Sequence, residues 1–127
     1  MAKKKKKVPL RTIMRRLVKK ADKVLSLYVR KETIRKYKLC PFCKVEPITV
    51  CFHFVRRARK SVRWLPDNTI GACGKCNFRE YRNPDPYRAF YIREFGVEKY
   101  LAIVDKSQED FTPTIEYLEK IIETYDA

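Results

Sequence analysis

The chain has 127 residues, and its 30 Lys and Arg against 15 Asp and Glu give a formal net charge of +15 at pH 7. An apolar fraction of 45% with 13% aromatics excludes the class of charged, weakly apolar chains that stay disordered, and the length suits one domain. No apolar run approaches the ~20 residues that span a bilayer. No apolar segment follows the lysine-rich start. We therefore expect neither a membrane helix nor a secretion signal.

The charge is unevenly distributed. Residues 1–39 carry 16 basic and 2 acidic side chains, residues 40–95 carry 11 and 5, and residues 96–127 carry 3 and 8. A basic surface of this kind suits a polyanion, because each phosphate that it neutralises releases counterions. Nucleic acid is thus the expected partner. A solubilising tail explains Lys3 to Lys7 alone, and an anionic membrane is a weaker alternative without a strongly apolar helical face.

Residues 1–9 are predicted to be a basic, disordered tail, and residues 10–38 a basic amphipathic helix. Apolar residues recur at intervals of three and four, which predicts one buried helical face. They are Leu10, Ile13, Met14, Leu17, Val18, Ala21, Val24, Leu25 and Tyr28. The basic residues off this stripe, which include Arg15, Arg16 and Lys19, either contact phosphate or form a solvated face.

Four of the five cysteines form two C-x-x-C pairs, Cys40 with Cys43 and Cys73 with Cys76. Paired cysteines in a basic chain without an export signal favour a tetrahedral, structural Zn²⁺ site. The disulfide alternative is disfavoured by the odd cysteine count and by loops too short for comfortable bridges. The long gap between the pairs leaves room for a functional loop.

The residues between the two cysteine pairs are predicted to form a hairpin. Residues 48–55 are β-branched and aromatic and are expected to form a strand, with a possible return strand over 62–65 and a turn at residues 66–68. A helix is expected to begin at the second cysteine pair.

The remaining chain is predicted to be helical. Asp85 and Pro86 predict a helix over roughly 86–95, which Gly96 ends. A shorter helix is expected over about 97–105. Thr112 and Pro113 are expected to open a last helix whose apolar residues share one face.

The only histidine, His53, lies in the predicted strand, Asn68 lies in the turn, and Asn77 directly follows Cys76. A lone histidine in a strand is more often structural, so its meaning depends on these neighbours. The predicted order is a strand, a turn that contains an asparagine, and a helix at the second cysteine pair. A ββα-metal finger has its elements in this order. The stretch resembles the HNH (His-Me finger) endonucleases, whose members often carry a paired-cysteine zinc site.

Within that superfamily the chain is most similar to the lambda NinG recombination-protein group of phage proteins. The resemblance rests on residues 26–30, the two cysteine pairs, His53 with Phe54, residues 63–68, Asn77, and the pattern from Tyr87 to Glu98. It implies an α+β fold in which a ββα-metal core with structural zinc (39–82) is flanked by the N-terminal helix and a helical C-terminal part (83–127). Residues 10–127 would form this single zinc-containing domain.

The resemblance also implies roles for the site residues. His53 would be the general base that activates water, Asn68 would orient its ring by a hydrogen bond, and Asn77 would bind a catalytic Mg²⁺ or Mn²⁺ ion. The implied activity is hydrolysis of phosphodiester bonds in branched or recombination-intermediate DNA of a phage, in the cytoplasm of the infected bacterial host.

Many HNH members carry Asp immediately before the base, where this chain has Phe52. Cys51 and Asp67 are possible compensating ligands, although a small buried thiol and an exposed turn residue are the simpler interpretations. The alternative function is therefore a non-catalytic, zinc-containing nucleic-acid-binding protein with a degenerate HNH site.

Basic residues near the histidine are expected to contact phosphate. They are Arg56, Arg57, Arg59, Lys60 and Arg63. Trp64 and Tyr81 could stack on unpaired bases, with core packing the better interpretation for Trp64. Single-stranded DNA is a further possible partner, and the oligomeric state stays open.

Overall fold

The computed structural model describes residues 7–126, which form a mixed helical structure with one small sheet. The helices are α1 (Leu10–Tyr37), α2 (Lys60–Arg63), α3 (Gly74–Glu80), α4 (Asp85–Phe95), α5 (Val97–Ser107) and α6 (Ile115–Tyr125), with a short 3₁₀ helix η1 (Pro66–Asn68). The strands are β1 (Val50–His53) and β2 (Thr69–Ala72). The α+β class is thus confirmed, while most of the predicted basic tail lies outside the described residues.

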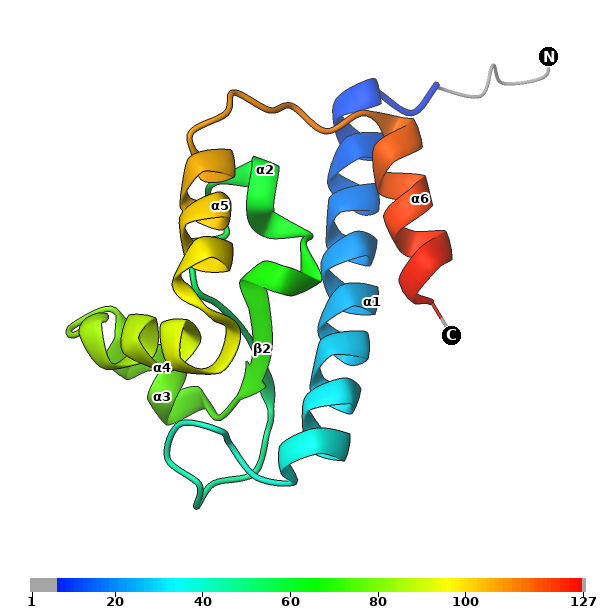
Figure 1. The fold of residues 1–127 in the computed structure, drawn as a ribbon. Helices are drawn as coiled ribbons and strands as arrows, with labels where there is room; N and C mark the ends of the chain where they lie inside the picture. The colour runs from blue at the N-terminus through cyan, green and yellow to red at the C-terminus, as the bar shows by residue number, and fades with distance from the viewer. Residues whose placement is uncertain (1–6, 127) are drawn as a thin grey trace, which may run out of the picture.

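Helix α1 runs the full height of the molecule and contacts both the sheet and α6 (Figure 1). The sheet lies on one side of α1, and α6 lies on the other and runs in the same direction (Figure 1). The predicted stripe is buried in its middle, at Ala21, Val24 and Leu25, but Leu10 at the start of α1 is 63% exposed. The outward basic face is confirmed, because Arg15, Arg16 and Lys19 are exposed.

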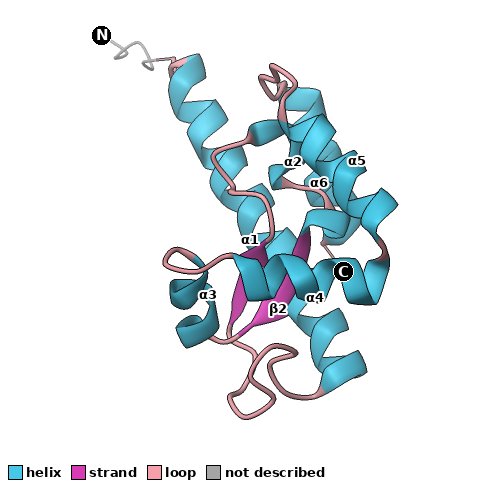
Figure 2. Ribbon diagram, turned by 60° about the vertical axis from the view of Figure 1, so that its left-hand side comes forward, coloured by secondary structure: helices cyan, strands magenta, loops and turns pink. Residues whose placement is uncertain are grey.

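The two strands pair antiparallel, with Cys51 opposite Gly71 and His53 opposite Thr69. In Figure 2, α4 lies in front of the sheet, α3 lies beside it at the left, and α1 lies behind it. Phe52 and Ile70 point into the aromatic cluster under α4, so the alternating Cys51 and His53 point to the α1 side.

Gly71 permits the close packing of β2 on α1. A Cβ atom at this position would lie 2.6 Å from Ile48 Cγ2 and 2.9 Å from Thr33 Cβ. The Gly71 amide also donates to Thr33 Oγ1 at 2.8 Å. Only glycine lets the strand backbone approach the helix this closely.

The hairpin differs from its predicted form. The return strand is Thr69–Ala72, and the expected strand over 62–65 is wrong: those residues include the end of α2, and the turn is the 3₁₀ helix η1. Val62 and Trp64 are nevertheless fully buried. Their apolar side chains pack into the core from the segment that connects the two strands, and not from a strand.

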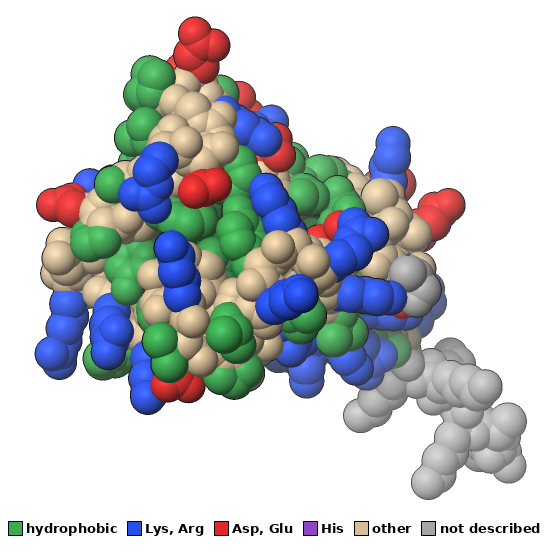
Figure 3. Space-filling model, turned by 60° about the horizontal axis from the view of Figure 1, so that its bottom comes forward, with side chains coloured by type: hydrophobic (Ala, Val, Ile, Leu, Met, Phe, Trp, Pro, Cys, Tyr) green, Lys and Arg blue, Asp and Glu red, His purple; other side chains and the backbone are tan. Residues whose placement is uncertain are grey.

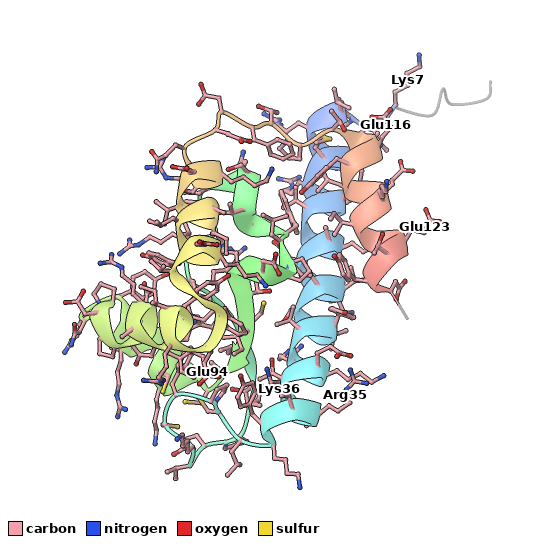
Figure 4. All side chains as sticks on the ribbon, viewed as in Figure 1. Lys7, Arg35, Lys36, Glu94, Glu116 and Glu123 are labelled. Atoms are coloured by element: carbon pink, nitrogen blue, oxygen red, sulfur yellow. The ribbon has the colours of Figure 1, made fainter. Side chains whose placement is uncertain are left out.

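The C-terminal helices follow the predicted order. Asp85 is the first residue of α4 and not its cap, and Gly96 ends α4 with a φ of 96°. Thr114, and not Thr112, caps α6, since its hydroxyl accepts from the Tyr117 amide at 3.1 Å. In Figure 4, Glu116 and Glu123 lie on α6, and both are exposed. No helix within residues 7–126 combines the length and apolar character needed to cross a membrane.

Candidate metal centre and catalytic groove

The four paired cysteines come together at one end of the sheet. Cys40 and Cys43 lie in the loop after α1, while Cys73 caps α3 and Cys76 lies in its first turn. Their sulfur atoms all lie within 4.8 Å of one another, and Cys43 Sγ is 3.9 Å from Cys73 Sγ. Tetrahedral Zn–S bonds of about 2.3 Å place sulfur atoms about 3.8 Å apart, so the cluster fits zinc.

Backbone amides support this cluster. The Glu46 and Val45 amides lower the pKa of the Cys43 thiol to about 7, whereas burial raises the pKa of Cys40 and of Cys76. The Cys76 amide donates to Cys73 Sγ at 3.4 Å. All five cysteines are free in the structure, as a metal site requires, because thiolates are the form that binds metal.

His53 is held by a main-chain carbonyl. Its Nε2 atom lies 3.0 Å from the Arg63 carbonyl oxygen. Because a carbonyl only accepts, Nε2 carries the hydrogen and Nδ1 of the neutral ring keeps a free lone pair. Burial is the main cause that lowers the pKa of His53 below its ordinary 6.5, which favours the neutral form at pH 7.

Asn68 does not perform the role that the sequence predicted. Its side chain is fully buried, accepts from the Val55 amide at 2.8 Å, and donates to the carbonyls of Val55 at 2.9 Å and Val62 at 3.1 Å. The expected hydrogen bond to the His53 ring is therefore wrong. Asn68 instead stabilises the segment between the two strands, which carries the Arg63 carbonyl. Its effect on the His53 ring is therefore indirect.

Asn77 and His53 line the same open space from different elements. A groove of about 410 Å³ between α1 and the sheet is lined by both, together with Asp22, Cys51 and Arg57. A second groove of about 320 Å³ continues past the same two side chains toward the end of α3. The structure thus brings His53 and Asn77 together, while Asn68 lies beneath them in the interior.

The possible substitutes for the missing carboxylate do not fit the role. Phe52 is fully buried, and its ring packs 4.8 Å from that of Phe42. Burial raises the pKa of the Cys51 thiol to about 12, so it stays protonated and is a poor metal ligand. The Asp67 carboxylate pairs with Lys99 at 3.2 Å on α5.

Two carboxylates that the sequence did not single out line the grooves. Asp22 of α1 lines the first, and Glu80, one turn after Asn77 on α3, lines the second. No spacing signal marks Asp22, which becomes a neighbour of His53 only when α1 packs on the hairpin. Glu80 could have been found from the i, i+3 spacing that places it on the Asn77 face.

Asp22 is the most connected side chain at the site. Its carboxylate accepts from Arg63 Nε at 3.0 Å and from Arg63 NH2, from Trp64 Nε1 at 2.9 Å, and from Arg57 NH2 at 3.2 Å. Arg63 therefore holds His53 through its carbonyl while α1 holds Arg63 through its guanidinium. Because the Arg63 side chain is only 14% exposed, its predicted phosphate contact is not supported.

The remaining predicted contacts are available to a ligand. Arg56, Arg57 and Arg59 are exposed in the segment between β1 and α2, and Lys60 is exposed at the start of α2. Lys23 and Arg30 of α1 also line the first groove, so basic side chains from two elements border it. The face in Figure 3, seen from below relative to Figure 1, carries Lys and Arg side chains both across it and at its edges. Trp64 is 1% exposed and belongs to the core, as predicted.

Comparison with known proteins returned no matching family model, no matching curated protein and no matching solved structure.

Proposed function

We propose that this protein is a metal-dependent DNA endonuclease in which β1, β2 and α3 form a ββα-metal core. The observation that carries the proposal is the arrangement of His53. Its Nε2 is fixed by the Arg63 carbonyl, its Nδ1 is free to accept a proton, and it shares a groove with Asn77 and Arg57. A general base needs this combination of a fixed ring, a neutral state and access to solvent.

In the proposed reaction, Nδ1 of His53 takes a proton from a water molecule in the groove. The water oxygen forms a bond to phosphorus as the bond from phosphorus to one sugar oxygen breaks. Lys23, Arg30 and Arg57 would hold the phosphate, because they border the groove from two sides.

A divalent ion would be held on the face of α3 that carries oxygen ligands. The Asn77 amide oxygen and the Glu80 carboxylate are hard ligands on one helical face, and both line the second groove with His53. An Mg²⁺ or Mn²⁺ ion there would neutralise charge that develops on the leaving oxygen. Zinc at the four cysteines would be structural, since it holds the start of α3 to the loop after α1.

The second candidate function, nucleic-acid binding without catalysis, is favoured by a different observation. Phe52 occupies the aromatic core, and Asp22 already accepts hydrogen bonds from Arg57, Arg63 and Trp64. Among the described residues that line the two grooves, Glu80 is then the one carboxylate left to bind a metal ion. On this reading the basic groove binds DNA and no bond is cut.

Nicking of supercoiled plasmid with Mg²⁺ or Mn²⁺ separates the two functions. His53→Gln is the informative variant, because a glutamine amide can still donate to the Arg63 carbonyl but cannot take the proton. We expect at least a ~100-fold loss of nicking, the scale of general-base catalysis. Asn77→Ala should also lose activity, and the exposed Asn83→Ala is its matched control. Equal nicking by wild type and His53→Gln would refute the endonuclease, and absence of nicking in both with DNA binding retained would support the second function.

A further inference from the structure

Two aromatic rings at the end of α3 are left uncovered by the fold. Phe78 is 61% exposed and Tyr81 is 60% exposed, and they lie three positions apart on neighbouring turns. Among residues 7–126, no other Phe, Tyr or Trp has more than half of its surface exposed. Two large rings exposed on one side of a helix are available to a ligand, because covering their apolar surface is favourable.

The position of Tyr81 connects this pair to the candidate site. Tyr81 lines the second groove together with His53, Asn77 and Glu80. Its ring is therefore beside the place where the scissile phosphate would lie. Phe78 precedes Tyr81 by three positions, a spacing that places the two side chains on the same side of the helix.

Arginine side chains accompany both rings. The Arg56 guanidinium carbon lies 5.0 Å from the centre of the Tyr81 ring, and that of Arg82 lies 5.5 Å from the centre of the Phe78 ring. The cations do not hide the rings, which stay more than half exposed. An aromatic ring with an adjacent guanidinium matches a nucleotide, because the ring can stack on a base while the cation reaches the neighbouring phosphate.

We propose that Phe78 and Tyr81 form a stacking surface for unpaired nucleobases next to the cleavage groove. Bases within a duplex have both faces covered by their neighbours, so only single-stranded, looped, frayed or branched segments present a free face. The proposal deepens the proposed function, on which it rests for the place of cleavage, and it names the substrate class as DNA with unpaired bases beside the scissile bond.

Binding without cleavage tests the proposal separately from catalysis. Protein carrying His53→Gln would be titrated into a single-stranded oligonucleotide that contains 2-aminopurine, and into the duplex of the same sequence, at fixed salt. Adding Tyr81→Ala should weaken single-strand binding about 5- to 100-fold, the range for loss of one stacked base, and should reduce quenching of 2-aminopurine. Duplex affinity should change less than about twofold, because phosphate contacts remain.

Two further variants keep the test decisive. Tyr81→Trp should restore single-strand affinity and quenching, because a larger ring still stacks. Leu101→Ala, which removes a side chain with 56% exposure on α5, is the matched control and should change neither affinity. Unchanged single-strand binding in Tyr81→Ala, or equal losses for single strand and duplex, would overturn the proposal.

A self-association surface is the other outcome that would overturn it. In that case Tyr81→Ala would change the sedimentation of the protein alone and leave single-strand binding intact. The proposed endonuclease activity is tested independently, by nicking. If wild type never nicks DNA but Tyr81→Ala loses single-strand affinity, the stacking surface stands and the catalytic assignment fails.

Discussion

Replacing Asp22 tests how His53, the proposed general base, is supported. In Asp22→Ala, the Arg63 guanidinium loses its carboxylate partner while its side chain is only 14% exposed, and the Trp64 indole N–H loses its acceptor. Breaking a fully buried ion pair costs about 3–5 kcal/mol. Because the Asp22 side chain is 28% exposed, we expect about 2–4 kcal/mol. For a domain of this size that loss lowers the Tm by about 10 °C.

The assay is urea unfolding of zinc-loaded protein, followed by circular dichroism, with plasmid nicking measured on the same samples. Asp85→Ala is the control, because its carboxylate is 83% exposed and pairs only with Arg88, so a change below about 0.5 kcal/mol is expected. Nicking should fall in Asp22→Ala under conditions where the protein stays folded, since the Arg63 carbonyl that holds His53 is no longer fixed.

A double variant sharpens the test. If the loss of stability arises from the unpaired Arg63 guanidinium, the double variant Asp22→Ala with Arg63→Met should be more stable than Asp22→Ala alone. Losses for Asp22→Ala and Asp85→Ala that agree within about 0.5 kcal/mol would refute the reasoning, as would strictly additive effects of the two substitutions.

Three further outcomes are expected. Gly71→Ala should destabilise by about 1–3 kcal/mol in urea unfolding, because its Cβ would overlap Ile48 and Thr33, whereas Gly74→Ala, with open space around it, should not. Metal chelation or Cys73→Ser should unfold the central region, and a cooperative melt of metal-free protein would contradict this. Since burial lowers the pKa of His53, nicking should stay constant from pH 8 down to 6.5 and fall only at lower pH as the ring gains a proton; a midpoint above 6.5 in the pH–rate profile would contradict this.

The sequence predicted the elements that local patterns define. The apolar repeat predicted α1, and the paired cysteines predicted a cluster that the structure confirms as close enough for metal. The return strand was placed too early because residues 62–65 carry apolar side chains that serve the core, whereas β2 contains the glycine that its contact with α1 demands. A pattern of apolar residues does not reveal which packing contact it serves.

Site residues were predictable where the chain itself places them together. Asn77 follows Cys76 on α3, so its approach to the hairpin follows from the metal cluster. Asp22 was not predictable, because nothing in its neighbourhood marks a residue that contacts Arg63 and Trp64 some 41 and 42 positions later. Asn68 was assigned the wrong partner, since an amide side chain bonds to backbone or ring equally well until the fold is known.

The assembly of the groove from two directions has a consequence for the living cell. Asn77 is placed beside the groove when the four cysteines come together at the start of α3, and the His53 ring is held when the first helix docks and Asp22 reaches Arg63. A chain that is still emerging from the ribosome, or one starved of zinc, lacks at least one of these two arrangements. On the proposed function, such a chain would be harmless to the genome around it, because the ability to cut would appear only with the finished molecule.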